Sequence, residues 1–261
     1  MIPIADSNPT SRRSIIVPLI VAADVLIFLF VQPTFRGDPD IPKDAQPIVF
    51  AICNAAIPDE ISSQRPLSEA AASELDQFGR VASQVQQQEC PDKSIWMSVL
   101  AAMFFHGGFL HLAGNMLFLW VFGNNIEDRM GWLGFIIFYL LAGAIATGAQ
   151  VLAGPGDTTP MIGASGAIAG VLGAYLLLYP HARVKTLIMF FIITIVEIPA
   201  AVVLLAWFGL QLLQGVGPGG LGDVGVAYWA HIGGFLAGMA LVRIFVRRPR
   251  LSAGPTPWSA L

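Results

Sequence analysis

Apolar residues gather into six stretches, each long enough to cross the hydrocarbon core of a bilayer, which takes about 20 residues. Polar and charged positions fall mainly between these stretches. The sequence therefore predicts an all-α, polytopic membrane protein built as a six-helix bundle. The six predicted spans are 14–34, 107–123, 132–152, 161–180, 185–209 and 226–246.

The long first loop, 35–106, has its own pattern. Residues 33–58 are rich in proline, which predicts an extended segment. Residues 68–88 are rich in Ala, Glu and Gln and predict an amphipathic helix, whose apolar positions are Leu75, Phe78, Val81 and Val85. Residues 95–105 are apolar and include Trp96, which is typical of an interfacial segment that dips into one leaflet.

Lysine and arginine are distributed unequally between the two sides of the predicted bundle. The loops 153–160 and 210–225 contain neither residue. Nine of the 14 basic residues lie at the opposite ends of the spans, so the positive-inside rule predicts that both termini are cytoplasmic. These nine are Arg12, Arg13, Arg129, Arg183, Lys185, Arg243, Arg247, Arg248 and Arg250. Residues 1–13 are then a cytoplasmic N-terminus, and 247–261 a cytoplasmic tail.

Composition agrees with a membrane protein, since 55% of residues are hydrophobic, 12% are charged and the mean hydropathy is +0.68. A net charge of −3 without a basic stripe gives no sign of nucleic-acid binding. Both cysteines, Cys53 and Cys90, lie in the first outer loop. A disulfide is permitted there, and two free thiols are the alternative.

Three spans carry polar residues near their predicted outer ends: His111 with Asn115, Ser165, and His231. His111, Ser165 and His231 each lie four or five residues into their span, so all three fall about 6–8 Å below its start. Polar groups inside a membrane are costly and usually functional. We expect these residues to share one layer of the bundle.

Small residues explain how these spans could approach one another. Gly166 and Gly170 form one face with small-xxx-small spacing, and Gly234 and Gly238 form another. Such faces allow close packing of membrane helices. If the fourth and sixth spans meet there, Ser165 and His231 come within hydrogen-bonding reach.

A serine is a weak nucleophile until a base removes its proton, and His231 is the best candidate base. His111 and Asn115 are four residues apart on one helix face and could stabilise an oxyanion together with the Ser165 backbone N–H. We expect a Ser–His dyad without an acidic third member. The remaining acids in or near the spans are interpreted as structural; these are Asp24, Glu197, Glu127 and Asp128.

These residues resemble the rhomboid family of intramembrane serine proteases over about 95–246. The motifs that carry the resemblance are Gly163-Ala164-Ser165-Gly166, His111 with Asn115, Ala230-His231 followed by Gly234 and Gly238, and Gly123 followed by Glu127-Asp128-Arg129. The resemblance implies a six-helix fold in which the second to sixth spans, 107–246, form the catalytic core. In it Ser165 is the nucleophile, His231 the general base, and His111, Asn115 and Gly163 the oxyanion hole. His106 matches a family position that we interpret as structural support.

The resemblance also implies cleavage of transmembrane or membrane-tethered proteins near the outer membrane face, with no metal or organic cofactor. Trp96 is followed by Met97 instead of the arginine that many members carry. Expected partners are transmembrane substrates and membrane lipids, with a homo-oligomer left open, and the expected location is a bacterial inner membrane. Two alternatives remain: a non-catalytic chaperone of this fold, and a metal site or transporter using His106, His111 and His231.

Overall fold

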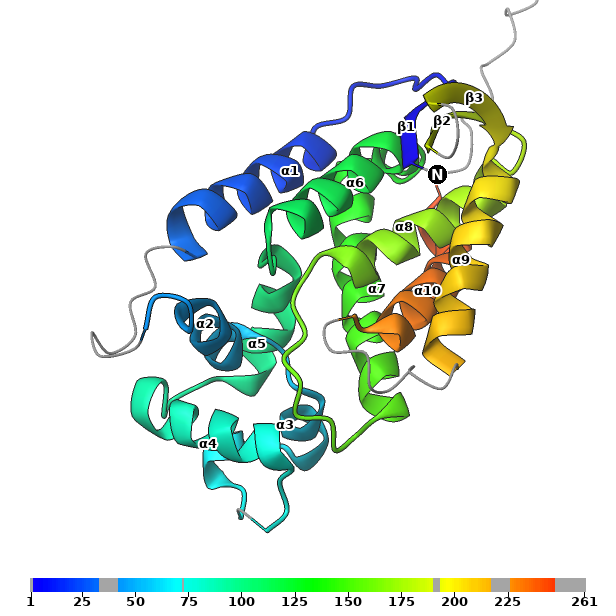
Figure 1. Ribbon diagram of the computed structural model, residues 1–261. Helices are drawn as coiled ribbons and strands as arrows, with labels where there is room; N and C mark the ends of the chain where they lie inside the picture. The colour runs from blue at the N-terminus through cyan, green and yellow to red at the C-terminus, as the bar shows by residue number, and fades with distance from the viewer. Residues whose placement is uncertain (1, 33–41, 72, 190–192, 217–225, 247–261) are drawn as a thin grey trace, which may run out of the picture.

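A computed structural model describes residues 2–32, 42–71, 73–189, 193–216 and 226–246. Six apolar helices form a bundle, with a group of short helices at one end and a small β-sheet at the other (Figure 1). The bundle helices are α1 (Ile16–Leu26, continued by the π-helical turn η1, Ile27–Val31), α6 (Phe109–Met130), α7 (Trp132–Ala153), α8 (Ser165–Leu178), α9 (Ala200–Val216) and α10 (Tyr228–Phe245).

Two of these helices, α7 and α10, are long and apolar enough to cross a membrane by themselves. A third candidate span is α6 together with the preceding α5 (Ile95–Ala101) and η4 (Ala102–Phe104), bent by 78° between them. The other apolar helices in the described part of the chain are shorter: Ile16–Val31, α8 and α9. The described part of the chain is thus a bundle of apolar helices of unequal length, of which two, or three with the bent pair, are long enough to cross a membrane. The predicted tail, 247–261, lies outside the described residues.

The start of α1 is fixed by an acidic side chain from α6. Glu127 accepts hydrogen bonds from the backbone N–H groups of Ile15, Ile16 and Val17 at 2.8–3.1 Å, and from the Ser14 hydroxyl. The first N–H groups of a helix have no partner within it, and their dipoles favour a negative charge. Glu127 therefore supplies the cap that the residues before α1 do not supply, which agrees with the structural interpretation of this acid.

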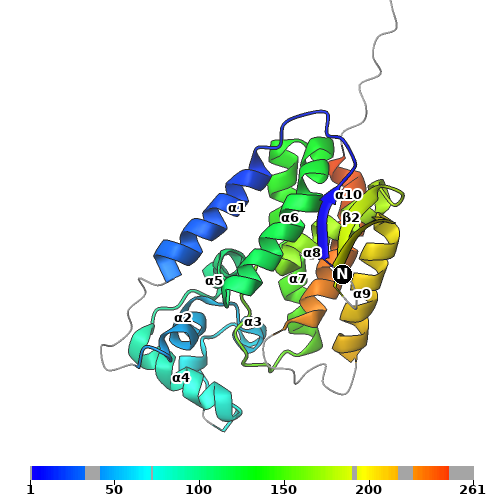
Figure 2. The same cartoon turned by 45° about the horizontal axis from the view of Figure 1, so that its top comes forward.

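The all-α prediction is wrong at the end of the bundle opposite the short helices. Strands β2 (Arg183–Met189) and β3 (Ile193–Pro199) pair antiparallel, and β1 (Ile2–Asp6) pairs with β2 at the other edge (Figure 2). The predicted span 185–209 is therefore strand in its first half, and the helix begins only at Ala200. The β-branched residues favour strand, and Pro199 cannot lie within a helix interior.

The short helices at the other end form a compact unit that we call the cap, residues 46–101. It consists of α2 (Gln46–Asn54), α3 (Pro58–Ser63), η3 (Leu67–Glu69), α4 (Gln77–Glu89) and α5. The extended segment expected at 33–58 is wrong over 46–54, where Pro47 occupies the second helical position and leaves the helix intact. The helix expected at 68–88 begins only at 77, because Asp76 caps it by accepting the Gly79 N–H at 2.6 Å.

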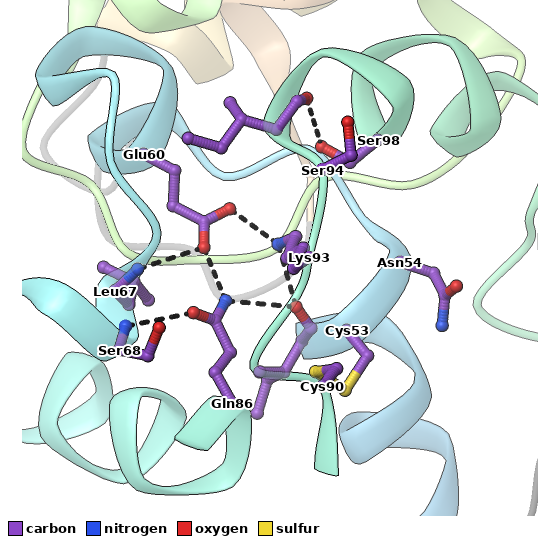
Figure 3. A network of polar contacts seen from close by, with 12 residues as sticks. Cys53, Asn54, Glu60, Leu67, Ser68, Gln86, Cys90, Lys93, Ser94 and Ser98 are labelled. Carbon is purple, nitrogen blue, oxygen red and sulfur yellow. Dashed lines mark hydrogen bonds and ion pairs between the residues drawn. A yellow bond between two sulfur atoms is a disulfide. The ribbon is translucent and has the colours of Figure 1, made fainter. Parts of the chain in front are cut away.

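A buried ion pair lies at the centre of the cap (Figure 3). Lys93 Nζ lies 2.6 Å from Glu60 Oε2, and both side chains are almost completely buried. Lys93 also donates to the Ile52 carbonyl at 2.9 Å, while Glu60 accepts from the Leu67 N–H and from Gln86. Burial lowers the pKa of Lys93, and the neighbouring Glu60 carboxylate offsets part of that shift. The pair ties α3, α4 and the segment before α5 together.

A disulfide closes the same unit. Cys53 at the end of α2 is bonded to Cys90 at the end of α4, 37 residues later (Figure 3). Of the two alternatives left open by the sequence, the structure has the disulfide. A cross-link of this kind stabilises a small unit chiefly by restricting its unfolded chain, so the cap has two independent means of staying folded.

Replacing Lys93 by methionine will test the contribution of this ion pair. The change leaves Glu60 charged and buried without its cation, so we expect a loss of about 3 kcal/mol in the stability of the cap. The measurement is thermal unfolding and protease resistance of the full chain in detergent. Arg65→Met is the matched control, because Arg65 and Glu74 form an exposed ion pair whose loss is worth about 1 kcal/mol or less. Equal effects of the two variants would contradict this account.

Candidate active site

The site is built where α8 and α10 pack with their backbones in contact. A Cβ placed on Gly234 would lie 2.1 Å from the Gly166 carbonyl oxygen, and one on Gly238 would lie 1.8 Å from the Gly170 carbonyl oxygen. No side chain larger than hydrogen fits at either position. The two small-residue faces expected from the sequence therefore meet each other.

This contact brings two polar side chains together at the cap end of the bundle. Ser165 lies one residue before Gly166, and His231 lies three residues before Gly234. The His231 Nε2 atom is 2.8 Å from the Ser165 Oγ, a normal hydrogen-bond length. Both side chains are half-buried. The spatial arrangement needed for a Ser–His pair is present.

Ser165 is the first residue of α8, not the fifth as the predicted span 161–180 implied. Its backbone N–H consequently has no acceptor within the helix, and it points out of the positive end of the helix dipole. The preceding Gly163 has a φ of +128°, which side-chain-bearing residues rarely adopt. This turn orients the start of α8 toward the cap.

His111 lies next to Gly163 and Ser165. A Cβ on Gly163 would be 2.9 Å from His111 Nε2 and 3.7 Å from Ser165 Oγ, so the missing side chain makes room for the imidazole. The Gly107 N–H donates to His111 Nδ1 at 3.3 Å. Because Nδ1 accepts, the ring proton of neutral His111 is on Nε2, the atom that lies next to Gly163.

The Gly163 N–H donates to the Ala102 carbonyl at 2.8 Å and is therefore not free to bind an oxyanion. The expectation that Gly163 contributes a donor needs correction on this point. Gly163 does line the pocket, but it contributes space for the His111 ring and the turn before Ser165.

Asn115 lies one helical turn beyond His111 on α6. Its side chain is buried, and its Nδ2 atom has no hydrogen-bond partner among the described residues. A buried amide donor without an acceptor costs stability, so its presence calls for an explanation. It is a donor available to a bound group.

His106 is almost fully buried, with its ring edge-on to His111 at a centroid distance of 5.4 Å. Gln32, which follows η1, holds its backbone: the His106 N–H donates to Gln32 Oε1 at 3.0 Å, and the His106 carbonyl accepts from Gln32 Nε2 at 2.9 Å. His106 thus packs against His111, and its ring nitrogens have no hydrogen-bond partner among the described residues.

A cavity of about 40 Å³ lies beside Ser165. Its walls include Ala102, Met103, Ala146, Gly163 and Gly166. A cavity needs about 10–15 Å³ of such space to hold one water molecule, so this one is large enough to hold water beside Ser165.

Comparison with known proteins shows which family has this arrangement of helices. The sequence pattern of the Rhomboid domain matches residues 93–248, more than half of the chain, including every residue of the pocket on α6, α8 and α10. The chain belongs to the rhomboid family.

Three relatives illustrate the range of similarity. Rhomboid-type serine protease 2 of Emericella nidulans is 26% identical over 88% of this chain and 42% of its own length. RHOMBOID-like protein 6, mitochondrial, of Arabidopsis thaliana is 29% identical over 89% of this chain and 69% of its own. Rhomboid protease GluP of Bacillus subtilis is 41% identical over 31% of this chain and 15% of its own length. This rhomboid chain thus spans less than half the length of the fungal and Bacillus relatives.

Sequence reasoning missed three residues that surround His231 in this rhomboid. Gln211 on α9 lies with its Oε1 2.7 Å from His231 Nδ1, and the Trp207 ring lies 5.9 Å from the imidazole. Gln150 on α7 accepts the Ala230 N–H at 3.2 Å and so caps the first turn of α10. Glutamine in an apolar helix was the available signal, but spacing along the chain does not connect it to His231.

None of the acidic residues discussed in the sequence analysis forms a hydrogen bond with Ser165 or His231 in the described part of this rhomboid. Asp24 is fully buried on α1, and neither carboxylate oxygen has a hydrogen-bond partner among the described residues. Glu197 was expected in the middle of a helix, but it lies in β3 opposite Lys185. Asp128 accepts from Ser11 at the sheet end of the bundle.

Replacing Gly234 by alanine will test the packing of α8 on α10. The added Cβ would overlap the Gly166 carbonyl, and because backbone must move, we expect a loss of about 2 kcal/mol or more. Thermal unfolding in one detergent measures it. Gly114→Ala on α6 is the control, since nothing lies within 4 Å of the added carbon; alanine there should stabilise the helix slightly. The account fails if Gly234→Ala unfolds at the wild-type temperature.

Proposed function

We propose that this rhomboid is an intramembrane serine endopeptidase. It hydrolyses peptide bonds of transmembrane or membrane-tethered proteins near the outer membrane face. The observation that carries the proposal is the 2.8 Å separation of His231 Nε2 and Ser165 Oγ at the starts of two tightly packed helices. Two relatives named as proteases, the fungal and the Bacillus proteins, support it.

In this mechanism His231 removes the hydroxyl proton of Ser165 while Oγ bonds to the carbonyl carbon of the substrate. The tetrahedral intermediate collapses when His231 gives that proton to the leaving amine. The acyl-enzyme is then hydrolysed by a water molecule that His231 deprotonates in the same way. The cavity beside Ser165 is the route by which water reaches the acyl group.

The developing oxyanion would be held by three donors. These are the Ser165 backbone N–H, the Nε2–H of His111 and the Nδ2–H of Asn115. The unpartnered state of Asn115 Nδ2 supports this role, because a donor kept free in a buried site is ready for charge that forms only during the reaction. Gly163 shapes the hole, and His106, Gly166, Gly170, Gly234 and Gly238 support it.

We place one membrane span in each of the six apolar helices, with both termini in the cytoplasm and the cap outside. The disulfide of the cap supports an oxidising compartment for that end. Helix α8 has 14 residues and a length of about 21 Å, less than the roughly 30 Å hydrocarbon core, so Ser165 lies below the outer surface. The membrane would be a bacterial inner membrane.

Two other functions are less well supported. A chaperone of this fold would have no use for the Ser165–His231 contact. A metal site formed by His106, His111 and His231 conflicts with the geometry of His231, whose two ring nitrogens already contact Ser165 and Gln211.

A fluorophosphonate probe will test the proposed activity on the purified full chain. We expect labelling of Ser165, because the base beside it generates the nucleophile, and cleavage of single-pass membrane proteins in the same preparation. Ser165→Ala should abolish both labelling and cleavage. Ser98→Ala, which removes a hydroxyl of the cap on α5, should retain both. Labelling that survives Ser165→Ala, or activity lost on adding a chelator, would overturn the proposal.

Replacing Asn115 by alanine separates stability from activity. Loss of one oxyanion donor should lower kcat by about 100-fold or more. Because Asn115 Nδ2 has no partner to lose, the unfolding temperature should change little. Substrate cleavage rates and thermal unfolding of the same preparation check the two expectations, and a parallel fall in both would argue for a merely structural amide.

A further inference from the structure

We infer that Gln211 is a positioning residue that fixes the proton of His231 on Nδ1 and thereby leaves Nε2 free to act as the base. This inference rests on the proposed function and deepens it by naming the partner of the dyad histidine. Its basis is the pair of contacts on one imidazole: Nδ1 lies 2.7 Å from Gln211 Oε1, and Nε2 lies 2.8 Å from Ser165 Oγ.

One face of α9 is shaped to make this contact. Trp207, Gln211 and Gly215 are four residues apart and therefore lie on the same side of the helix. The Trp207 ring packs against the imidazole, and Gln211 is buried, with 8% of its surface exposed. A Cβ on Gly215 would lie 3.2 Å from Ile232 and 3.4 Å from Tyr228, so glycine allows the first turn of α10 to come close.

The chemistry of the amide determines the tautomer. An amide oxygen only accepts, so a hydrogen bond between Gln211 Oε1 and Nδ1 requires the proton on Nδ1. The Nε2 lone pair then faces the hydroxyl of Ser165. The opposite tautomer would present Nε2–H to Ser165, and a protonated nitrogen cannot remove the hydroxyl proton.

The neighbouring His111 shows the opposite arrangement, because the Gly107 N–H donates to its Nδ1. His111 and His231 thus carry their protons on different nitrogens. The partner of Nδ1 decides which: the Gly107 N–H for His111 and Gln211 Oε1 for His231. His111 is also a titratable side chain that interacts electrostatically with His231, so its protonation must be considered in any pH profile of His231. Gln211 is neutral, so it orients the imidazole without stabilising the imidazolium as a carboxylate would.

Nitrogen NMR of the full chain in detergent, labelled with ¹⁵N-histidine, tests the tautomer directly. The chain has only four histidines, and His231→Asn assigns the relevant signals. We expect a protonated Nδ1 and an unprotonated Nε2 for His231 in the wild type and in Gln211→Glu. In Gln211→Leu we expect a mixture of both tautomers, with His111 unchanged. A wild-type His231 protonated on Nε2, or the same tautomer in Gln211→Leu, overturns the inference.

The labelling rate of Ser165 by the fluorophosphonate probe, measured against pH, tests the consequence. Gln211→Leu should slow labelling in proportion to the fraction of enzyme that carries the His231 proton on Nε2, because that fraction has no available base. Gln211→Glu should keep the reaction and move the acidic limb of the profile up by about one pH unit, because a carboxylate favours the imidazolium. Gln214→Leu, on an exposed position of α9, is the matched control and should match the wild type.

A purely structural role for Gln211 predicts a different result. Gln211→Leu would then lower the unfolding temperature without changing the tautomer or the pH profile, and Gln211→Glu would leave the acidic limb in place; either finding refutes the inference. If the wild type is neither labelled nor active, the proposed function fails. The NMR comparison still decides the role of Gln211 in that case.

Discussion

The distance between α8 and α10 is the constraint on which the pocket depends. Carbonyl oxygens of α8 at Gly166 and Gly170 lie where side chains of α10 would otherwise be, and glycine at 234 and 238 leaves that space empty. Since Ser165 and His231 are one and three residues from these contacts, the packing that joins the helices also sets the distance between hydroxyl and imidazole. The Ser165–His231 geometry is therefore set mainly by the contact between the two backbones, and little depends on the flexibility of the side chains.

The starts of the helices explain where polar groups are tolerated in so apolar a bundle. A helix start leaves N–H groups without partners, and an apolar environment makes each one costly. Glu127 satisfies those of α1, and Gln150 satisfies one of α10. At α8 the first N–H belongs to Ser165 itself, and on α6 the Asn115 amide has no hydrogen-bond partner among the described residues. Free donors at Ser165 and Asn115 are what a site for transient negative charge requires.

Local pattern was sufficient for some of this arrangement and insufficient for the rest. The Ser165–His231 contact could be predicted because glycines at fixed spacing lie beside both residues on apolar helices. Gln211 could not, because its contact with His231 depends on how α9 rotates about its own axis, which its nearly uniform apolar sequence leaves undefined. The strands at 183–199 were missed since β-branched apolar residues suit both a buried helix and a strand, and only Pro199 hinted at the break. The helix at 46–54 was not predicted because the prolines around it suggested an extended segment.

The cap matters to the pocket through the segment that leads into α8. Ala56 pairs with Met161 in a β-bridge, and the Asp59 N–H donates to the Asp157 carbonyl at 3.0 Å. Both cap residues lie outside the matched domain, 93–248. They hold the loop whose last turn contains Gly163 and so orient Ser165. The disulfide and the Lys93–Glu60 pair keep these anchors in place. A portion of the chain outside the matched domain therefore helps to position Ser165, in addition to the packing of α8 on α10.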